Sequence, residues 1–244
     1  MLFRSDGYTL ILGHSGTFAV NPSLYSKLPF DTVRDFAPIS LAASTPFILA
    51  VHPSLPVSTV KQLIALAKAK PGELHFPSSG TGNSTHLAGE LFNAMAGVTL
   101  VHVPYKGTGP GLNDLIAGRL SLVFNAPGSV LPHIRSGRLR AIAVTSSSRS
   151  SVMPELPTVS ESGLPGYEAS TWHGVLAPAK TPRQIVVRFN AEIIKALATA
   201  EVKERFAALG MDPIGNTPEQ FAVYIQAEIV RWGKVIKTSG AKPE

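Results

Sequence analysis

A polar, glycine-rich segment at residues 78–90 (SSGTGNSTHLAGE) has the composition of an anion-binding loop. It joins a short predicted strand near residues 74–77 to the start of a predicted helix. Gly80 and Gly82 let backbone N–H groups turn toward a ligand, and the dipole of the following helix favours a negative charge. A well-capped helix without a ligand would show the same pattern, so both interpretations stay open. The candidate ligand contacts here are Ser79, Gly80, Gly82, Asn83, Ser84, Thr85 and His86.

Residues 103–111 (VPYKGTGPG) form a second candidate loop that also follows a predicted strand. Tyr105 offers an aromatic wall with a hydroxyl group, Lys106 a positive charge, and Gly107 a backbone amide. An ordinary Gly-Pro turn with a solvated Lys106 would explain the segment as well. The loop is therefore a second candidate for contact with an anion.

Two shorter segments, residues 13–17 (GHSGT) and 171–174 (TWHG), could add groups to a ligand site. Ser15 and Thr17, at the end of a predicted strand, suit hydrogen bonding to a ligand. Trp172 and His173 could line a cleft, although tryptophan is more often a core residue.

Known catalytic and metal motifs fail at specific positions. Thr85 replaces the third glycine of a dinucleotide-binding fingerprint, no Gly-Lys-Ser/Thr follows for a P-loop, and Thr17 occupies the last glycine position of a nucleophile elbow. His86 and Glu90 lie one helical turn apart, but a metal would need a third ligand. We therefore expect no catalytic residues, no metal and no cofactor.

Composition narrows the class of protein further. Apolar residues make up 44% of the 244 residues and charged residues 16%, as in a globular domain with a sizeable core. The net charge of +6 favours anionic partners, but the cationic side chains are too scattered for a nucleic-acid site. No stretch reaches the length needed to span a membrane, and residues 1–5 do not read as a signal peptide.

Strand and helix patterns alternate along the chain, which indicates an α/β fold with mainly parallel sheets. A capping box, Thr217 with Gln220, starts a helix at residues 218–237. The other helices are predicted at residues 58–70, 86–97, 112–117, 130–136, 182–198 and 201–209, and strands at residues 9–13, 47–52, 74–77, 100–103, 120–124, 139–145 and 171–177.

The order and spacing of six segments resemble the substrate-binding proteins of tripartite tricarboxylate transporters, known as the Bug family. The similarity extends from Asp6 to about Glu244. The segments are DGYTLILG, NPSLYSKLPFDTVRDFAPIS, SSGTGNSTHLAGELF, VHVPYKGTGPGLNDLIAGRLSLVF, LRAIAVTSSSRS and PTVSESGLPGYEASTWHGVLAPAKTP.

This resemblance implies an α/β, two-lobed, periplasmic-binding-protein-like fold (type II, Venus flytrap) with parallel-rich sheets flanked by helices. Residues 1–48 and 170–244 would form lobe 1, and residues 49–169 lobe 2. Family members normally begin with a signal peptide, a first strand with a PFxPGG-like loop, and a helix. We expect that first strand and helix of lobe 1 to be missing, because DGYTLILG comes at the start of this sequence.

The resemblance also implies a function. The protein would be a periplasmic receptor, monomeric as the family expectation has it, that captures a di- or tricarboxylate, an aromatic acid or an acidic amino acid and delivers it to membrane permease subunits. The family's cleft segments carry over onto Ser15, Thr17, residues 79–86 and residues 105–107, and onto Asn125, Trp172 and His173. Two alternatives stay open: a serine-dependent α/β enzyme using Ser15 or Ser84, and a ligand-sensing domain for signalling.

Overall fold

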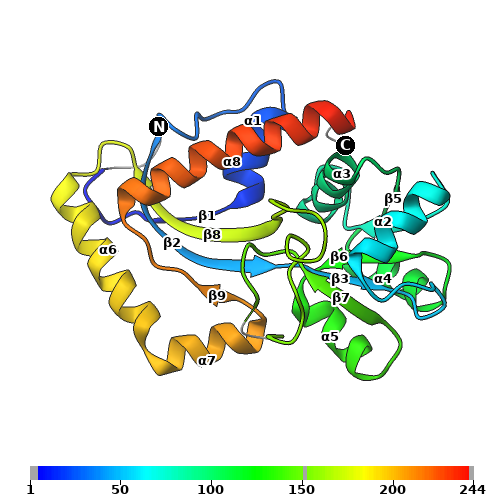
Figure 1. The fold of residues 1–244 in the computed structure, drawn as a ribbon. Helices are drawn as coiled ribbons and strands as arrows, with labels where there is room; N and C mark the ends of the chain where they lie inside the picture. The colour runs from blue at the N-terminus through cyan, green and yellow to red at the C-terminus, as the bar shows by residue number, and fades with distance from the viewer. Residues whose placement is uncertain (1–4, 151–152, 242–244) are drawn as a thin grey trace. The chain divides into compact units, whose positions relative to one another are not determined.

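The computed structural model describes residues 5–150 and 153–241 (Figure 1). These residues form two compact units. The first unit contains the residues up to Thr45 together with Thr171–Lys237, and the second contains Pro46–Ser170 together with the residues after Lys237. No helix within the described ranges is long and apolar enough to cross a membrane.

A four-stranded sheet with the order β1-β8-β2-β9 forms the centre of the first unit. β1 pairs antiparallel with β8, and β2 pairs antiparallel with β9. The strands are β1 (Ile11–His14), β2 (Phe36–Pro46), β8 (Ser170–Pro178) and β9 (Asp212–Pro213), and the helices are η1 (Gly16–Val20), α1 (Asn21–Leu24), α6 (Arg183–Ala198), α7 (Ala200–Leu209) and α8 (Pro218–Ser239).

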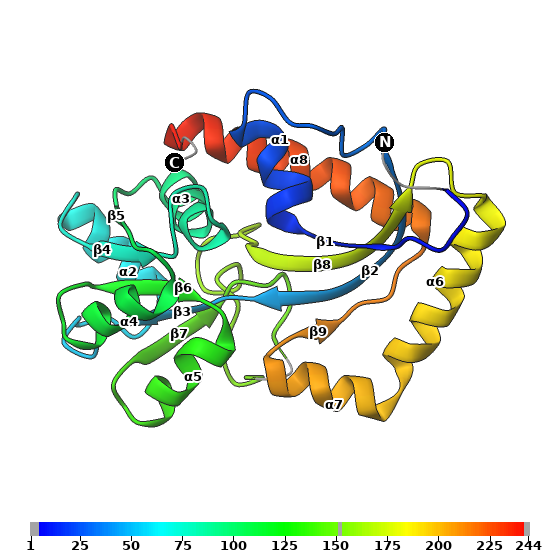
Figure 2. The same ribbon diagram turned by 180° about the vertical axis from the view of Figure 1, so that it is seen from behind.

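Alternation along β8 explains how helices cover both faces of this sheet. Trp172 packs edge-on against Phe221 of α8, and α8 runs beside β8 in both views (Figures 1 and 2). Ala177 points to the opposite face, where it forms an apolar cluster with Ile39 of β2 and Val186 of α6. The sheet therefore lies between α8 and α6.

The second unit contains a three-stranded sheet, β6-β3-β7, and a parallel pair, β4-β5. β3 lies between β6 and β7 and is antiparallel to both. The strands are β3 (Ile48–Val51), β4 (His75–Ser78), β5 (Val101–Pro104), β6 (Leu122–Asn125) and β7 (Arg140–Val144), and the helices are α2 (Val60–Ala69), α3 (Ser84–Ala96), α4 (Thr108–Ile116) and α5 (Pro127–Arg135).

β6 continues the β4-β5 pair, although its contact with β4 is not a regular ladder. Ser121, just before β6, donates its backbone N–H to His75 at the start of β4 (2.9 Å) and accepts from the His75 N–H through its hydroxyl (3.2 Å). Because the two strands start together and pack side by side, they run in the same direction. The three strands therefore end at the same edge, and their last residues are Ser78, Pro104 and Asn125.

Helices cover both faces of the second unit. On one face, Phe76 packs edge-on against Phe124, and Gly89 of α3 lies so close to Phe76 that a side chain would collide with its ring. On the other face, Leu115 of α4 packs in a buried cluster with Ile48. α3 and α4 are thus held on opposite sides of the strands whose loops they follow.

The predicted helices all occur, and the capping box at α8 is confirmed: Gln220 accepts from the Thr217 N–H (3.0 Å) and Thr217 accepts from the Gln220 N–H (3.2 Å). The sheets are mixed rather than mainly parallel. The physical reason is β3, which lies between two strands that both run against it. Four elements were not predicted: η1, α1, β2 and β9.

Candidate functional site

The candidate loops of the second unit meet at one edge of its strands. Residues 79–83 follow β4 and residues 105–107 follow β5, and the Tyr105 N–H donates to the Ser78 carbonyl (3.1 Å). The backbone of Gly80 passes close to that of Tyr105. The structure therefore brings together the predicted residues of both loops, with Asn125 at the end of β6 on the same edge.

The loop after β4 is hydrogen-bonded mainly to itself and to the start of α3. Ser78 is buried, and its hydroxyl accepts from the Gly80 N–H (3.1 Å) and donates to the Gly80 carbonyl (3.0 Å). Gly80 has φ +138° and Gly82 φ +76°, values that favour glycine, so the tight turn depends on these two residues. The Ser79 N–H points to the Thr85 hydroxyl (3.4 Å).

Asn83 is the N-cap of α3, and its side-chain oxygen accepts from the Thr85 N–H (3.1 Å). The hydroxyls of Ser84 and Thr85 also donate to this oxygen (3.3 Å each). One turn into the helix, His86 Nδ1 accepts from the Gly82 N–H (3.0 Å). The Gly82 amide, which the sequence suggested as a ligand contact, is thus bonded to His86.

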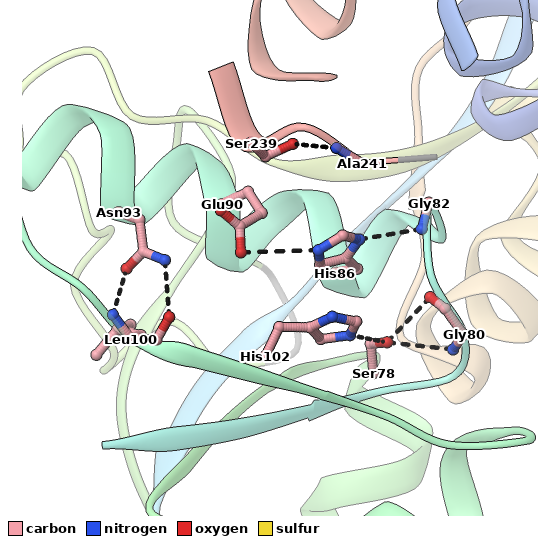
Figure 3. Close-up of polar contacts among 10 residues, drawn as sticks. All are labelled: Ser78, Gly80, Gly82, His86, Glu90, Asn93, Leu100, His102, Ser239 and Ala241. Atoms are coloured by element: carbon pink, nitrogen blue, oxygen red, sulfur yellow. Dashed lines mark hydrogen bonds and ion pairs between the residues drawn. The ribbon is translucent and has the colours of Figure 1, made fainter. Parts of the chain in front are cut away.

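His86 is buried in a cluster of polar side chains beside the loop, in which His102 and Glu90 are half-buried (Figure 3). Its ring stacks on His102 of β5, with centroids 3.8 Å apart and planes inclined by 20°. His102 Nε2 lies 2.6 Å from the Ser78 hydroxyl. On the other side, His86 Nε2 lies 3.7 Å from a carboxylate oxygen of Glu90, close enough for electrostatic attraction but not for a hydrogen bond.

In the loop after β5, the side chain of Tyr105 lies against α4. The Tyr105 hydroxyl donates to Asp114 (2.7 Å), and Arg119 also pairs with that carboxylate (2.7 Å). The hydrogen bond to the Asp114 carboxylate raises the pKa of Tyr105. The pKa of Asp114 is lowered, first by that hydrogen bond and then by the one from Arg119. The Tyr105 hydroxyl is thus committed to Asp114.

The start of α4 differs from the start of α3, because its N-cap is Gly107, which has no side chain to accept a hydrogen bond. Gly107 has φ +102°, and Gly109 in the first turn is exposed with open space where a side chain would point. Lys106 is exposed immediately before the cap. This helix start can accept an anion through its N–H groups and an adjacent positive charge.

Asn125 is buried at the end of β6 and bonds locally, accepting from the Ala126 N–H (2.8 Å). Ala126 is the N-cap of α5, which also has no side-chain cap, and Pro127 opens that helix. The three strand ends therefore differ in whether a nearby side chain accepts hydrogen bonds from the first N–H groups of the helix that follows.

In the first unit, Ser15 and His173 lie at the end of the β1-β8 pair. His14 pairs with His173 across the two strands, and Ser15 follows directly. Among the described residues, the Ser15 hydroxyl and His173 Nδ1 are buried without a hydrogen-bond partner. Burial, and then the charge of His14, hold the pKa of His173 below the usual histidine value. Thr17 bonds to His14 (3.0 Å).

Trp172 lies in the core of the first unit. Its side chain is fully buried, and its indole N–H donates to Glu228 (3.2 Å), which also accepts from the Trp232 indole N–H (3.1 Å) and pairs with Arg231 (2.6 Å). Trp172 is thus anchored to α8 through Glu228, and a contact between Trp172 and a ligand stays a prediction.

His102 was not predicted from the sequence as part of the site region, although Ser78, which it contacts, belongs to the predicted loop segment. His102 interrupts an apolar strand, VHVP, and a polar residue on the inward face of a strand is a usable signal. Its partner could not be found from spacing, because Ser78 and His102 meet only through the β4-β5 register. No group of three or more His, Asp or Glu side chains in the described ranges is arranged to hold a metal.

In an α/β fold, polar loops at the carboxyl ends of the strands are where ligands bind. Residues 3–241 match the profile of the "Tripartite tricarboxylate transporter family receptor" family, and the chain belongs to this family. It is similar to "Protein BugT" of Bordetella pertussis, with 41% identity over 239 residues, 98% of this chain and 73% of BugT.

Two solved structures are similar along nearly the whole chain. "R. palustris Rpa4515 with adipate" has a TM-score of 0.82 and 38% identity, covering 100% of this chain and 81% of the other. "MatC (Rpa3494) from Rhodopseudomonas palustris with bound malate" has a TM-score of 0.74 and 31% identity, covering 96% and 81%. The predicted family and fold class are confirmed. Because the family consists of transporter receptors, this chain is a receptor rather than the serine-dependent enzyme that the sequence left open.

Proposed function

We propose that this protein is a periplasmic receptor that captures a small dicarboxylate and delivers it to the permease of a tripartite tricarboxylate transporter. The observation that carries the proposal is the similarity to two receptors whose structures contain adipate and malate. Both ligands are short aliphatic dicarboxylates. Among the acids that the family resemblance allows, this class is therefore the best supported.

In the second unit, the start of α4 supports the proposal. A helix without a side-chain cap presents backbone N–H groups and the positive end of its dipole, which stabilises a carboxylate. Lys106 adds a full positive charge beside this position. We propose that a carboxylate binds the first-turn N–H groups of α4, with Ser79 and Asn125 at the same edge contributing side-chain contacts.

In the first unit, the buried hydroxyl of Ser15 and His173 Nδ1 support a second set of contacts. A buried polar atom without a partner costs free energy, roughly 1–3 kcal/mol, unless a ligand or water satisfies it. Both groups can donate a hydrogen bond to a carboxylate oxygen. We propose Ser15, Thr17 and His173 as the ligand-binding residues of this unit.

A thermal unfolding screen tests the proposal directly. The protein would be heated with adipate, malate, citrate, benzoate or glutamate, and hits titrated by calorimetry. At a ligand concentration of 100 times Kd, binding stabilises the folded state by about 2.7 kcal/mol. For a domain of this size, that free energy corresponds to a rise in Tm of roughly 5–10 °C.

The monocarboxylate hexanoate serves as the matched ligand for adipate, because it has the same chain length and one carboxylate fewer. We expect stabilisation by adipate or malate and little by hexanoate. Stabilisation by benzoate alone would point to an aromatic acid, and stabilisation by glutamate alone to an acidic amino acid, in place of a simple aliphatic dicarboxylate. No stabilisation by any of these acids would contradict carboxylate capture itself.

A further inference from the structure

We propose that His86 is a proton-sensitive cap on the loop after β4, so that acidification releases Gly82 and weakens ligand binding at this edge. This inference rests on the proposed function, since the loop is taken to be part of the carboxylate site. His86 acts here as a positioning residue, because both of its ring nitrogens face groups of its own unit.

The position of His86 in its helix is the starting point. With Asn83 as N-cap, His86 is the third residue of α3, and it accepts from the N–H of the residue just before the cap. Gln62 does the same at the start of α2: with Thr59 as N-cap, its side-chain oxygen accepts from the Ser58 N–H (2.7 Å). Each acceptor lies four residues after its donor.

The two side chains differ in one chemical property. The amide oxygen of glutamine accepts a hydrogen bond at any physiological pH. An imidazole nitrogen accepts only while it is unprotonated, and histidine is the side chain that usually titrates between about pH 5 and 8. A proton on His86 Nδ1 would place one N–H against another and break the bond to Gly82. The cap on α3 can therefore be released by a proton, and the cap on α2 cannot.

One carboxylate, that of Glu90, faces the ring of His86. Glu90 lies 3.7 Å from Nε2 and would pair with the imidazolium. His102 from β5 is the other titratable group against the ring. From β4 and β6, the residues turned to this face are Phe76 and Phe124, which carry no charge. Among the described residues, Glu90 is thus the counter-charge that we assign to the switch.

His102 keeps the ring of His86 in place and holds the other end of the loop. The Ser78 hydroxyl donates its single proton to the Gly80 carbonyl, so the 2.6 Å contact is satisfied when His102 Nε2 carries a proton. Two stacked imidazoles disfavour a second positive charge. Protonation of His86 should therefore change the loop at Gly82, whereas the Ser78 end, which contacts His102 (Figure 3), should stay fixed.

The first experiment needs no ligand. In NMR spectra of the whole protein, the Gly82 amide signal should move with pH, with the same midpoint as the ring nitrogens of His86. The Ser58 amide, which donates to Gln62, is the internal control, and its signal should not shift as the pH passes that midpoint. His86→Gln should make the Gly82 signal insensitive to pH, and Glu90→Gln should move the midpoint to lower pH. A Gly82 signal that stays unchanged while His86 is protonated would overturn the proposal.

The second experiment measures adipate affinity by calorimetry between about pH 8 and pH 6, the range in which histidines usually titrate. The natural protein should lose roughly tenfold in affinity, equal to about 1.4 kcal/mol, whereas His86→Gln should change little. His86→Phe keeps a flat ring for stacking but removes the acceptor, so this variant should bind adipate weakly at both limits of the pH range. Any titration of adipate affects every variant equally and cancels in the comparison.

The two experiments separate the proposals. If no carboxylate binds at any pH, the proposed function fails, and the Gly82 signal still decides whether the cap responds to protons. If adipate binds with the same pH dependence in the natural protein and in His86→Gln, the link between the cap and the ligand is contradicted.

Discussion

The loops after β4 and β5 leave the same edge of the second unit, and each leads into a helix, yet their helix starts are satisfied differently. At α3, Asn83 accepts from the first turn and His86 accepts from Gly82. At α4, the cap is Gly107, which brings no acceptor, and Lys106 precedes it. One loop supplies its own hydrogen-bond acceptors, and the other leaves N–H groups for an external acceptor.

The difference shows that glycine content alone does not identify an anion site. Residues 78–90 have the more suggestive composition, with three glycines, two of them in the loop itself, and a run of hydroxyl residues. Three of those hydroxyls donate hydrogen bonds within the segment itself: Ser78 to the Gly80 carbonyl, and Ser84 and Thr85 to the Asn83 side chain. We therefore propose the less conspicuous loop after β5 as the carboxylate position.

The largest expected effect comes from giving α4 a carboxylate of its own. Gly109→Asp places an acidic side chain in the first turn, where nothing obstructs it. The helix should be stabilised by about 0.3–1 kcal/mol. Adipate binding should weaken by roughly 100-fold or more, because close like charges cost several kcal/mol. Calorimetry and thermal unfolding would show affinity and stability moving in opposite directions.

Gly109→Ala is the matched control for that variant, since it adds the side-chain carbon without charge. It should keep adipate binding within about threefold, the range expected of a surface change. If Gly109→Asp bound adipate as well as Gly109→Ala does, the start of α4 would not be the carboxylate position.

Removing the charge of Lys106 should have a smaller effect. Because Lys106 is exposed, its attraction to a carboxylate is screened by solvent and contributes about 1 kcal/mol or less. Lys106→Gln should therefore weaken adipate binding by roughly three- to fivefold and reduce its dependence on salt. Lys68→Gln on α2 is the control. Equal losses in the two variants would point to net charge alone.

Removing the side chain at the helix start should destabilise the protein more at α3 than at α4. Asn83→Ala removes the acceptor at α3 and should cost about 1 kcal/mol, equivalent to a fall in Tm of roughly 2–4 °C. Thr108→Ala, at the start of α4, removes no cap and should change stability by less than about 0.5 kcal/mol. Thermal unfolding compares them, and equal destabilisation would contradict the contrast between the loops.

The smallest expected effect is the loss of the Tyr105 hydroxyl. Its hydrogen bond is the main reason that the pKa of Asp114 is lowered, so in Tyr105→Phe that pKa should rise toward the usual aspartate value. A lowered carboxyl pKa stabilises the fold above the usual aspartate pKa, and this contribution disappears as pH falls through the lowered value. NMR titration of Asp114 measures the shift. An unchanged pKa would show that Arg119 alone sets it.

Periodicity and turn residues were enough to predict most helices of this fold. The helix predicted at residues 58–70 is α2, and Thr59 is its N-cap, because the Thr59 side chain accepts from the Gln62 N–H. Local hydrogen bonds of this kind depend on nearby residues only. They are therefore visible in the sequence.

The rest depended on contacts between distant residues. β2 was missed because its buried run contains serine, threonine and two prolines, which favour loops. The His86–His102 stack depends on the β4-β5 register, and Trp172 is fixed by Glu228 on α8. No local pattern distinguishes a tryptophan that bonds a buried carboxylate from one that lines a ligand site.

The most direct test of the central claim is a crystal structure of this protein with adipate. The account predicts a carboxylate oxygen about 2.7–3.2 Å from the backbone N–H of Thr108 or Gly109, with Lys106 nearby. Adipate bound with both carboxylates away from the start of α4, against the loop of residues 79–83 alone, would contradict it.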